Sequence, residues 1–332
     1  MEFNKLTNVP SLHQIKQAAQ QIQDVVLKTP LLYAPRLSES FGAAIFLKRE
    51  DLQEVRSYKI RGAFHKIANI PAELRSHGVV AASAGNHAQG VALSCALLGI
   101  QAYIFMPKTT PLQKVEAVRF HGKEKVRIKL VGNTYDEAFE AAQTFCQQNK
   151  SIFIPPFDDY DIIAGQATVA LEIVNQLPSP ADFMLVAIGG GGLAAGSGLV
   201  LEALSPDTKL IGVEPALAPS MSESLLAHQV VTLDSIDSFV DGASVKRVGA
   251  KTFGICEKVL DRMLVVEKQV LCQTMLDLYQ FYGMIVEPAG ALSVAALEQI
   301  RSEIQGKTIV CVISGGNFDT KRFPEIKALA HN

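Results

Sequence analysis

The chain has 332 residues, of which 48% are hydrophobic and 19% are charged, and its formal net charge is −2. These values are typical of a compact protein with an ample core, and the lack of a basic stripe argues against nucleic acid as a partner. No apolar run reaches the roughly 18 residues of a membrane span, and the first residues lack the apolar segment of a signal peptide. Five widely spaced cysteines form no metal or disulfide pattern. We therefore expect a cytoplasmic protein without a membrane partner.

The predicted elements form two series in which short apolar strands alternate with helices. A helix capped by Ser11 opens the chain and ends before Thr29 and Pro30. Helices that begin near Asn86, Pro111 and Thr134 separate the strands of the first series. These strands are predicted at Val79–Ser83, Ala102–Met106, Val126–Val131 and Ile152–Ile154. Helical crossovers between successive strands predict a parallel sheet that is covered on both faces.

The second series follows Pro155 and Pro156, where we place a domain boundary. Its strands are predicted at Phe183–Ile188, Leu210–Val213, Met263–Val266 and Thr308–Ile313. Its helices are predicted from Leu193, near Pro219, and over Gln269–Phe281 and Ala289–Ile304, and residues 230–249 are less regular. The chain is therefore predicted to be an α/β protein of two three-layer domains with mostly parallel sheets.

Lys59 stands at the start of a predicted helix, just after a strand and loop at residues 44–53. The N-terminus of a helix repels cations, so an amine there loses part of its preference for the charged form. A neutral amine can attack a carbonyl group to form a Schiff base. A lone lysine is more often an ordinary surface residue, so the motifs further along the chain must decide its role.

Gly189, Gly190, Gly191, Gly192 and Leu193 directly follow a strand and open a helix. Successive backbone N–H groups at a helix N-terminus form a cup that suits a phosphate. The same segment also satisfies a dinucleotide fingerprint, in which Glu214, at the end of the next strand, would contact a ribose. A nicotinamide-dependent dehydrogenase is therefore an alternative, and a non-enzymatic small-molecule-binding protein is another.

Two further motifs lie where predicted strands end. Ser83, Gly85, Asn86 and His87 offer a hydroxyl, backbone donors, an amide and an imidazole that could grip a carboxylate or a ring hydroxyl. A plain N-cap would also explain Asn86, and a histidine in the first helical turn would explain His87. Ser314 follows the last strand, at the edge where α/β sites form. Near it in sequence, Glu287 opens a helix, and its charge suits a helix start.

Taken together and in this order, the motifs resemble those of the pyridoxal-phosphate enzymes of the tryptophan-synthase β fold type, also called fold type II. The similarity is carried by Ser57–Ala63, Ser83–Gly90, the four glycines, Glu287–Ala291 and Ser314–Asn317. Three further segments resemble the threonine dehydratase (threonine ammonia-lyase) group, namely Lys48–Gln53, Met106–Pro111 and Pro156–Asp158. The resemblance extends from about Leu31 to Asn317.

The resemblance implies pyridoxal 5′-phosphate as the cofactor and assigns a role to each motif. Lys59 would hold the cofactor covalently and take the Cα proton of the substrate, and Asn86 would contact the 3-hydroxyl of the ring. Ser314 would face the pyridine nitrogen. The phosphate would be bound by Gly189, Gly190, Gly191, Gly192 and Leu193, and the substrate carboxylate by Ser83, Gly85, Asn86 and His87. Residues 1–52 with 156–332 would form a large cofactor-binding domain, and residues 53–155 a small substrate-side domain.

The implied reaction is the β-elimination of L-threonine to 2-oxobutanoate and ammonia, in the isoleucine branch of branched-chain amino-acid biosynthesis. L-Serine would be a slower substrate that gives pyruvate. A hydroxyl at Ser314 leaves the ring a weaker electron sink than a carboxylate would, which favours elimination. A serine dehydratase or racemase of the same fold, or a threonine synthase, stays an alternative. In the racemases a serine at the position of Ala84 acts as acid and base, and alanine cannot transfer a proton.

The resemblance also bears on metal binding, assembly and regulation. Glu214 matches one ligand of the racemases' cation site, but Ser220 stands where an aspartate is expected, so no metal is predicted. A homodimer or homotetramer is expected. Only about fifteen residues follow the Ser314 motif, too few for an independent domain. We therefore expect a short form without the isoleucine-binding regulatory domain of the long biosynthetic enzymes.

Overall fold

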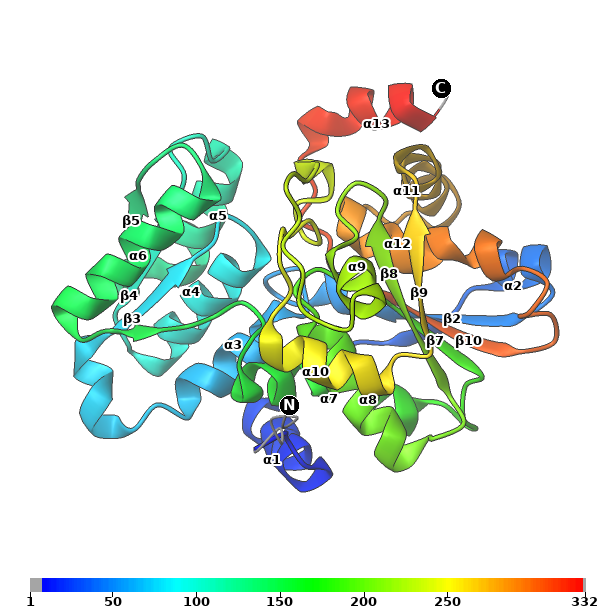
Figure 1. Cartoon of the computed structure of the whole chain (residues 1–332), viewed down its shortest axis with the longest axis horizontal. Helices are drawn as coiled ribbons and strands as arrows, with labels where there is room; N and C mark the ends of the chain where they lie inside the picture. The colour runs from blue at the N-terminus through cyan, green and yellow to red at the C-terminus, as the bar shows by residue number, and fades with distance from the viewer. Residues whose placement is uncertain (1–7, 331–332) are drawn as a thin grey trace.

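The computed structural model describes residues 8–330, and their strands form two separate sheets (Figure 1). The six-stranded sheet has the order β1-β2-β10-β7-β8-β9. Its strands are β1 (Leu31–Tyr33), β2 (Ala44–Arg49), β7 (Phe183–Ala187), β8 (Lys209–Pro215), β9 (Arg262–Val266) and β10 (Thr308–Ile313). The four-stranded sheet has the order β5-β4-β3-β6, with β3 (Val79–Ala82), β4 (Ala102–Met106), β5 (Val126–Leu130) and β6 (Ile152–Phe153).

The strand pairing confirms the prediction of mostly parallel sheets. Within the described residues, β1 pairs with β2 in the antiparallel sense, and the other neighbouring strands pair in parallel. Their connections are helical crossovers, as parallel pairing requires. The eight strands predicted in the two series are all present, and the strand predicted within residues 44–53 is β2, whereas β1 was not predicted.

Helices cover both faces of the four-stranded sheet, which makes this part of the molecule three layers thick. Val79 and Ala81 face α4 (Asn86–Leu98) and α5 (Leu112–Gly122), whereas Val80 and Ala82 face α6 (Tyr135–Asn149). Successive strand residues point to opposite faces, so a strand buried on both sides has an unbroken apolar sequence.

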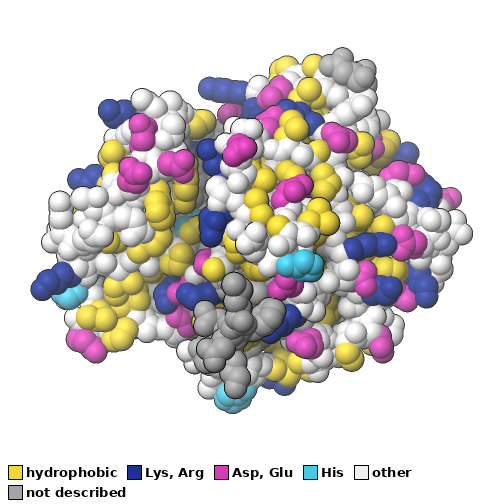
Figure 2. Space-filling view, viewed as in Figure 1, with side chains coloured by type: hydrophobic (Ala, Val, Ile, Leu, Met, Phe, Trp, Pro, Cys, Tyr) yellow, Lys and Arg dark blue, Asp and Glu magenta, His cyan; other side chains and the backbone are white. Residues whose placement is uncertain are grey.

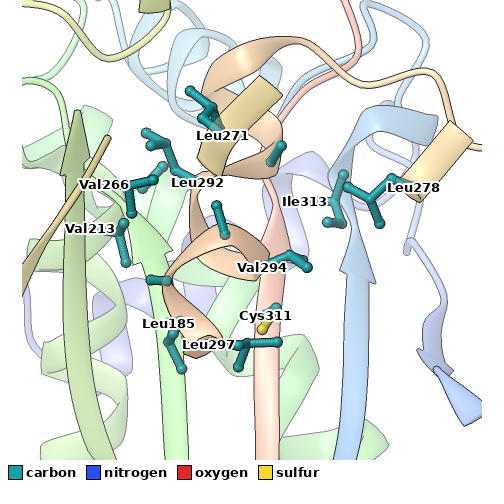
Figure 3. Packing of buried hydrophobic residues seen from close by; sticks show 14 of the residues in the cluster. Leu185, Val213, Val266, Leu271, Leu278, Leu292, Val294, Leu297, Cys311 and Ile313 are labelled. Atoms are coloured by element: carbon teal, nitrogen blue, oxygen red, sulfur yellow. The ribbon is translucent and has the colours of Figure 1, made fainter. Parts of the chain in front are cut away.

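The six-stranded sheet also lies between two helical layers. One face packs against α7 (Tyr160–Gln176), α8 (Gly192–Leu204) and α10 (Ala250–Val259), with α1 (Leu12–Ile22) behind them. The other face packs against α11 (Lys268–Tyr282), α12 (Pro288–Ala295) and α13 (Phe323–Ala330). Figure 3 shows this second core, where Leu292 of α12 and Leu271 of α11 lie above the apolar side chains of the strands.

The remaining elements are short. The α-helices not yet described are α2 (Pro35–Phe41), α3 (Lys59–Ala68) and α9 (Ser220–Leu226). Helix α3 begins with Lys59, the lysine discussed above. The 3₁₀ turns are η1 (Glu50–Leu52), η2 (Ala72–His77), η3 (Lys123–Lys125), η4 (Ser238–Val240), η5 (Ala296–Ile300) and η6 (Thr320–Arg322). No helix among residues 8–330 is long and apolar enough to cross a membrane.

Two predicted helices are shorter than expected. Ser11 caps α1 as predicted, and its side chain accepts a hydrogen bond from the backbone N–H of Gln14, but the helix ends at Ile22, well before Thr29. The helix predicted over 289–304 ends at Ala295, where a 3₁₀ turn replaces it. In both places apolar residues continue beyond the helix and are buried by tertiary contacts, so the apolar pattern alone overstates helix length.

A buried ionic network fixes α3 to its surroundings. Arg61 donates from Nε and Nη2 to the two carboxylate oxygens of Glu50, at 2.8 Å each, and from Nη1 to Glu172 Oε1 on α7 at 2.7 Å. Lys48 of β2 bonds the other oxygen of Glu172 at 2.6 Å. Burial alone raises the pKa of Glu50, but the charge and hydrogen bonds of Arg61, the charge of Lys48 and the hydrogen bond from Thr29 together outweigh it and hold the pKa below its usual value. Two positive and two negative charges therefore compensate one another away from water.

Candidate active site

The predicted site residues lie where strands of both sheets end. β3 leads into the turn at Ser83–His87, β7 into the glycine loop at Gly189–Leu193, and β10 into Ser314. Lys59 starts α3, which packs against α4 on one side and α7 on the other, and so lies between the two sheets. In Figure 2 the surface is hollowed between the lobe of the four-stranded sheet and the rest of the molecule, with Lys and Arg side chains along the furrow.

Lys59 is half-buried, and its Nζ donates to the carbonyl oxygen of Pro156 at 3.0 Å. Burial lowers the pKa of Lys59 to about 8, while the carboxylate of Glu287 acts in the opposite direction. A sizeable fraction of this amine is therefore neutral near physiological pH. A Cβ atom at Gly90 would lie 3.2 Å from the carbonyl carbon and oxygen of Lys59, so the close approach of α4 to the start of α3 favours glycine there.

Asn86 is held by two side chains from the other end of the chain. Its Nδ2 donates to Glu287 Oε1 at 2.6 Å, and its Oδ1 accepts from Asn317 Nδ2 at 2.7 Å. One hydrogen of Nδ2 remains for a ligand. Glu287 stands at the start of a helix, as the sequence indicated, because it is the N-cap residue of α12, but its side chain makes no capping hydrogen bond and binds Asn86 instead. Burial raises the pKa of Glu287 to about 7, and the charge of Asp241 adds to this rise.

Ser314 lies within reach of the same group of residues. Its Oγ donates to the carbonyl oxygen of Ala289 over a long 3.3 Å, and its own carbonyl oxygen accepts from the N–H of Tyr58, next to Lys59. A Cβ atom at Gly315 would lie 2.2 Å from Glu287 Oε1, so only glycine fits beside that carboxylate. These contacts bring Lys59, Asn86 and Ser314 to one place.

The glycine loop is shaped by residues that are far away in sequence. Gly191 has a φ of +92°, a conformation that favours glycine, and it caps the N-terminus of α8. A Cβ atom at Gly190 would lie 2.1 Å from the ring of Phe157, which covers the loop. The carbonyl oxygen of Gly190 accepts a 2.6 Å hydrogen bond from Thr252 Oγ1 of α10. The N-terminus of α10 is capped in turn by Asp158, which accepts from the N–H of Lys251 at 2.8 Å.

The Ser83–His87 turn is ordered by its own hydrogen bonds. Ser83 Oγ accepts from the N–H of Gly85 at 3.2 Å, and His87 Nε2 donates to the carbonyl oxygen of Ile154 at 2.9 Å. Burial and the nearby charge of Lys59 lower the pKa of His87 to about 3, so its imidazole is neutral. The turn thus presents the unpaired N–H groups at the start of α4 to the space beside Asn86.

Glu214 does not belong to this group. It is fully buried at the end of β8, and its carboxylate accepts hydrogen bonds from the N–H of Met221 and from the N–H and Oγ–H of Ser222. Burial raises its pKa to about 7 despite these three donors. Because Glu214 is fully buried and both of its oxygens bind the start of α9, it is not presented to a ribose, which removes the main support for the nicotinamide alternative.

The residues fit pyridoxal phosphate. An amine with a lowered pKa, an amide with a free N–H and a weakly bonded hydroxyl meet at one place, and the backbone donors of α8 form an anion cup nearby. In keeping with this, the family model described as "Pyridoxal-phosphate dependent enzyme" matches residues 22–315. The chain is 51% identical over 310 residues to the L-threonine dehydratase biosynthetic IlvA of Halalkalibacterium halodurans, covering 93% of this chain and 75% of that relative.

The chain belongs to the threonine dehydratase group of the pyridoxal-phosphate dependent enzymes. As a member of this family it uses pyridoxal phosphate, and its fold is that of the family. The processed form of threonine deaminase isoform 2 from Solanum lycopersicum superposes with a TM-score of 0.91 at 37% identity, over 97% of this chain and 90% of that one. Maize serine racemase gives 0.90 at 30% identity, over 97% and 99%. The predicted family, fold and cofactor are therefore confirmed.

Proposed function

We propose that this threonine dehydratase converts L-threonine to 2-oxobutanoate and ammonia. The observation that carries the proposal is the half-buried amine of Lys59, which has a pKa of about 8 and lies where strands of both sheets end. It stands in a chain that is 51% identical to a biosynthetic threonine dehydratase. Loss of the β-hydroxyl as water and hydrolysis of the resulting imine balance the reaction. We propose residues 1–52 with 156–332 as the cofactor domain and 53–155 as the substrate-side domain.

Pyridoxal phosphate supplies the aldehyde that takes up the amino group and the ring that draws electrons from Cα. Lys59 serves as the amine that holds the cofactor and then as the base that removes the Cα proton. The backbone N–H groups of Gly189, Gly190, Gly191, Gly192 and Leu193 would bind the phosphate. The free N–H of Asn86 would bind the ring hydroxyl, and the neutral hydroxyl of Ser314 would face the ring nitrogen.

The substrate carboxylate is proposed to bind at the turn of Ser83, Gly85, Asn86 and His87. Its N–H groups open α4, whose N-terminus favours a negative charge. The neutral imidazole of His87 supports the turn through Ile154 rather than acting as a second charge. Ala84, in the middle of this turn, has no group that could deliver a proton to the opposite face of Cα.

The direct test replaces the amine. Lys59→Ala should lower kcat by at least a thousandfold, because both the attachment point and the base are lost, and borohydride should no longer fix a pyridoxyl group on the peptide that contains residue 59. The matched control is Lys66→Ala on the same helix, which removes an ion pair with Asp159 and should leave kcat within twofold. Robust ammonia release by Lys59→Ala would overturn the proposal.

Substrate choice is proposed to favour L-threonine, with L-serine as a slower substrate that gives pyruvate. Assays with both amino acids separate this substrate preference from the alternatives. They measure the keto acid that is formed and the chirality of the unreacted serine. Steady formation of D-serine would favour a serine racemase and contradict the argument from Ala84. Release of threonine from a phosphorylated precursor would favour a threonine synthase.

We also propose a homodimer or homotetramer in the cytoplasm. Exposed apolar side chains on β1 and at the end of α11, namely Leu32, Tyr33 and Phe281, support burial against a second copy. The five cysteines are free and buried, which suits a reducing compartment. Sedimentation velocity tests the assembly, and a purely monomeric protein at micromolar concentration would contradict it.

A further inference from the structure

Gln166 of α7 is buried without using its amide. It is 1% exposed, and among residues 8–330 neither its Nε2 nor its Oε1 has a hydrogen-bond partner. Buried amides are nearly always hydrogen-bonded, because a donor that is removed from water and left unpaired destabilises the fold. The side chain therefore calls for a partner other than the described residues.

The position of Gln166 indicates what that partner is. A Cβ atom at Gly192, the first residue of α8, would lie 2.3 Å from Gln166 Oε1. On its other side, a Cβ atom at Gly62 would lie 3.1 Å from Gln166 Cγ, and Gly62 belongs to the helix that starts at Lys59. The side chain of Gln166 thus lies between the glycine loop and the helix that carries Lys59. Gly192 and Gly62 have no side chain that would displace it.

The surroundings suit a phosphate group. The first N–H groups of α8 have no partner within the helix, and the N-terminus of this 13-residue helix carries partial positive charge. Phe157 covers the same place, because Cβ atoms at Gly190 and Gly192 would meet its ring and its Cβ respectively. A fully ionised phosphate ester only accepts hydrogen bonds, so it would turn the Nε2 side of the amide toward itself.

We propose that the Gln166 amide is a ligand of the cofactor phosphate, in addition to the backbone of the glycine loop. This inference rests on the proposed role of Gly189–Leu193 and deepens it. The donation from Nε2 gives the amide the partner that the protein itself does not supply, and a hydrogen bond to a charged acceptor is stronger than one between neutral groups.

The test measures equilibrium binding to the apoenzyme of two probes, pyridoxal phosphate and pyridoxal, which lacks the phosphate. Gln166→Met keeps the length of the side chain but removes its hydrogen bonds, and it should raise the Kd for pyridoxal phosphate at least tenfold while that for pyridoxal stays within twofold. The melting temperature of the apoenzyme should not fall, because an unpaired amide has been removed. Gln166→Glu adds a negative charge and should weaken pyridoxal phosphate further.

The control is Ser197→Ala, further along α8, because the buried hydroxyl of Ser197 likewise has no partner among the described residues. It should leave both Kd values unchanged. Equal loss of affinity for both probes in Gln166→Met, or no loss, would overturn the assignment. If Gln166→Met does not fold, the Kd values of Gln166→Glu for pyridoxal phosphate and pyridoxal are compared instead. If the wild-type apoenzyme binds pyridoxal as tightly as pyridoxal phosphate, the glycine loop is not a phosphate site, and the proposed function itself fails at that point.

Discussion

Removing Arg61 should destabilise the protein far more than removing a surface arginine. Arg61→Met leaves the buried carboxylate of Glu50 without its positive partner, and breaking a buried ion pair in this way costs about 3–5 kcal/mol. At an unfolding entropy of about 2.1 cal/mol/K per residue, 332 residues give roughly 0.7 kcal/mol per degree, so the melting temperature should fall by about 4–7 °C.

Calorimetry of the variants and the wild type measures this fall. The control is Arg119→Met, whose exposed pair with Glu116 contributes less than about 1 kcal/mol. In the double variant Arg61→Met with Glu50→Gln, the unpaired charge is also removed, while Lys48 and Glu172 still balance each other. The double variant should therefore regain at least half of the loss. A fall no larger than that of the control, or a double variant that loses the sum of both single losses, would refute charge compensation as the basis of the network.

The remaining predictions concern the cofactor site. Thr252→Val should raise the Kd for pyridoxal phosphate roughly tenfold in absorbance titrations, because the hydroxyl no longer holds the carbonyl of Gly190. Thr252→Ser keeps the hydroxyl and should bind the cofactor as the wild type does. Equal binding by both variants would show that the hydroxyl is not needed. Borohydride-fixed attachment of the cofactor to the apoenzyme should accelerate as the pH rises through about 8, since only neutral Lys59 attacks the aldehyde. Because the charge of Glu287 raises that pKa, Glu287→Gln should move the midpoint to lower pH, and an unmoved midpoint would contradict the coupling.

The strands were predictable because both sheets are buried on both faces. Strands such as Val79–Ala82 are unbroken apolar runs between glycine or helix signals, and the parallel order follows from the helices between them. Helix α7 was missed for a related reason. Its residues Ile163, Ala167 and Ala170 pack into the same core as α1 and α8, while Gly165 meets α3, so its sequence lacks the polar stripe that marks an amphipathic helix.

The site was predictable only where one segment carries its own signal. Lys59 and Asn86 stand in local motifs, and the glycine loop directly follows a strand. The partner of Asn86 could not be predicted, because Glu287 lies 201 residues further along the chain. Helix α10 was missed likewise, since its N-cap residue is Gly249 and the carboxylate that binds its first N–H groups belongs to Asp158, more than 90 residues earlier.

The order of the strands has a consequence for how the chain folds as it is synthesised. The four-stranded sheet comes from one continuous stretch, which ends at Phe153, whereas β2 pairs with the last strand, β10. On the ribosome, the smaller sheet can close while the larger one still lacks an inner strand. Until Ile313 has emerged, the edge of β2 that β10 will cover stays open to unwanted pairing.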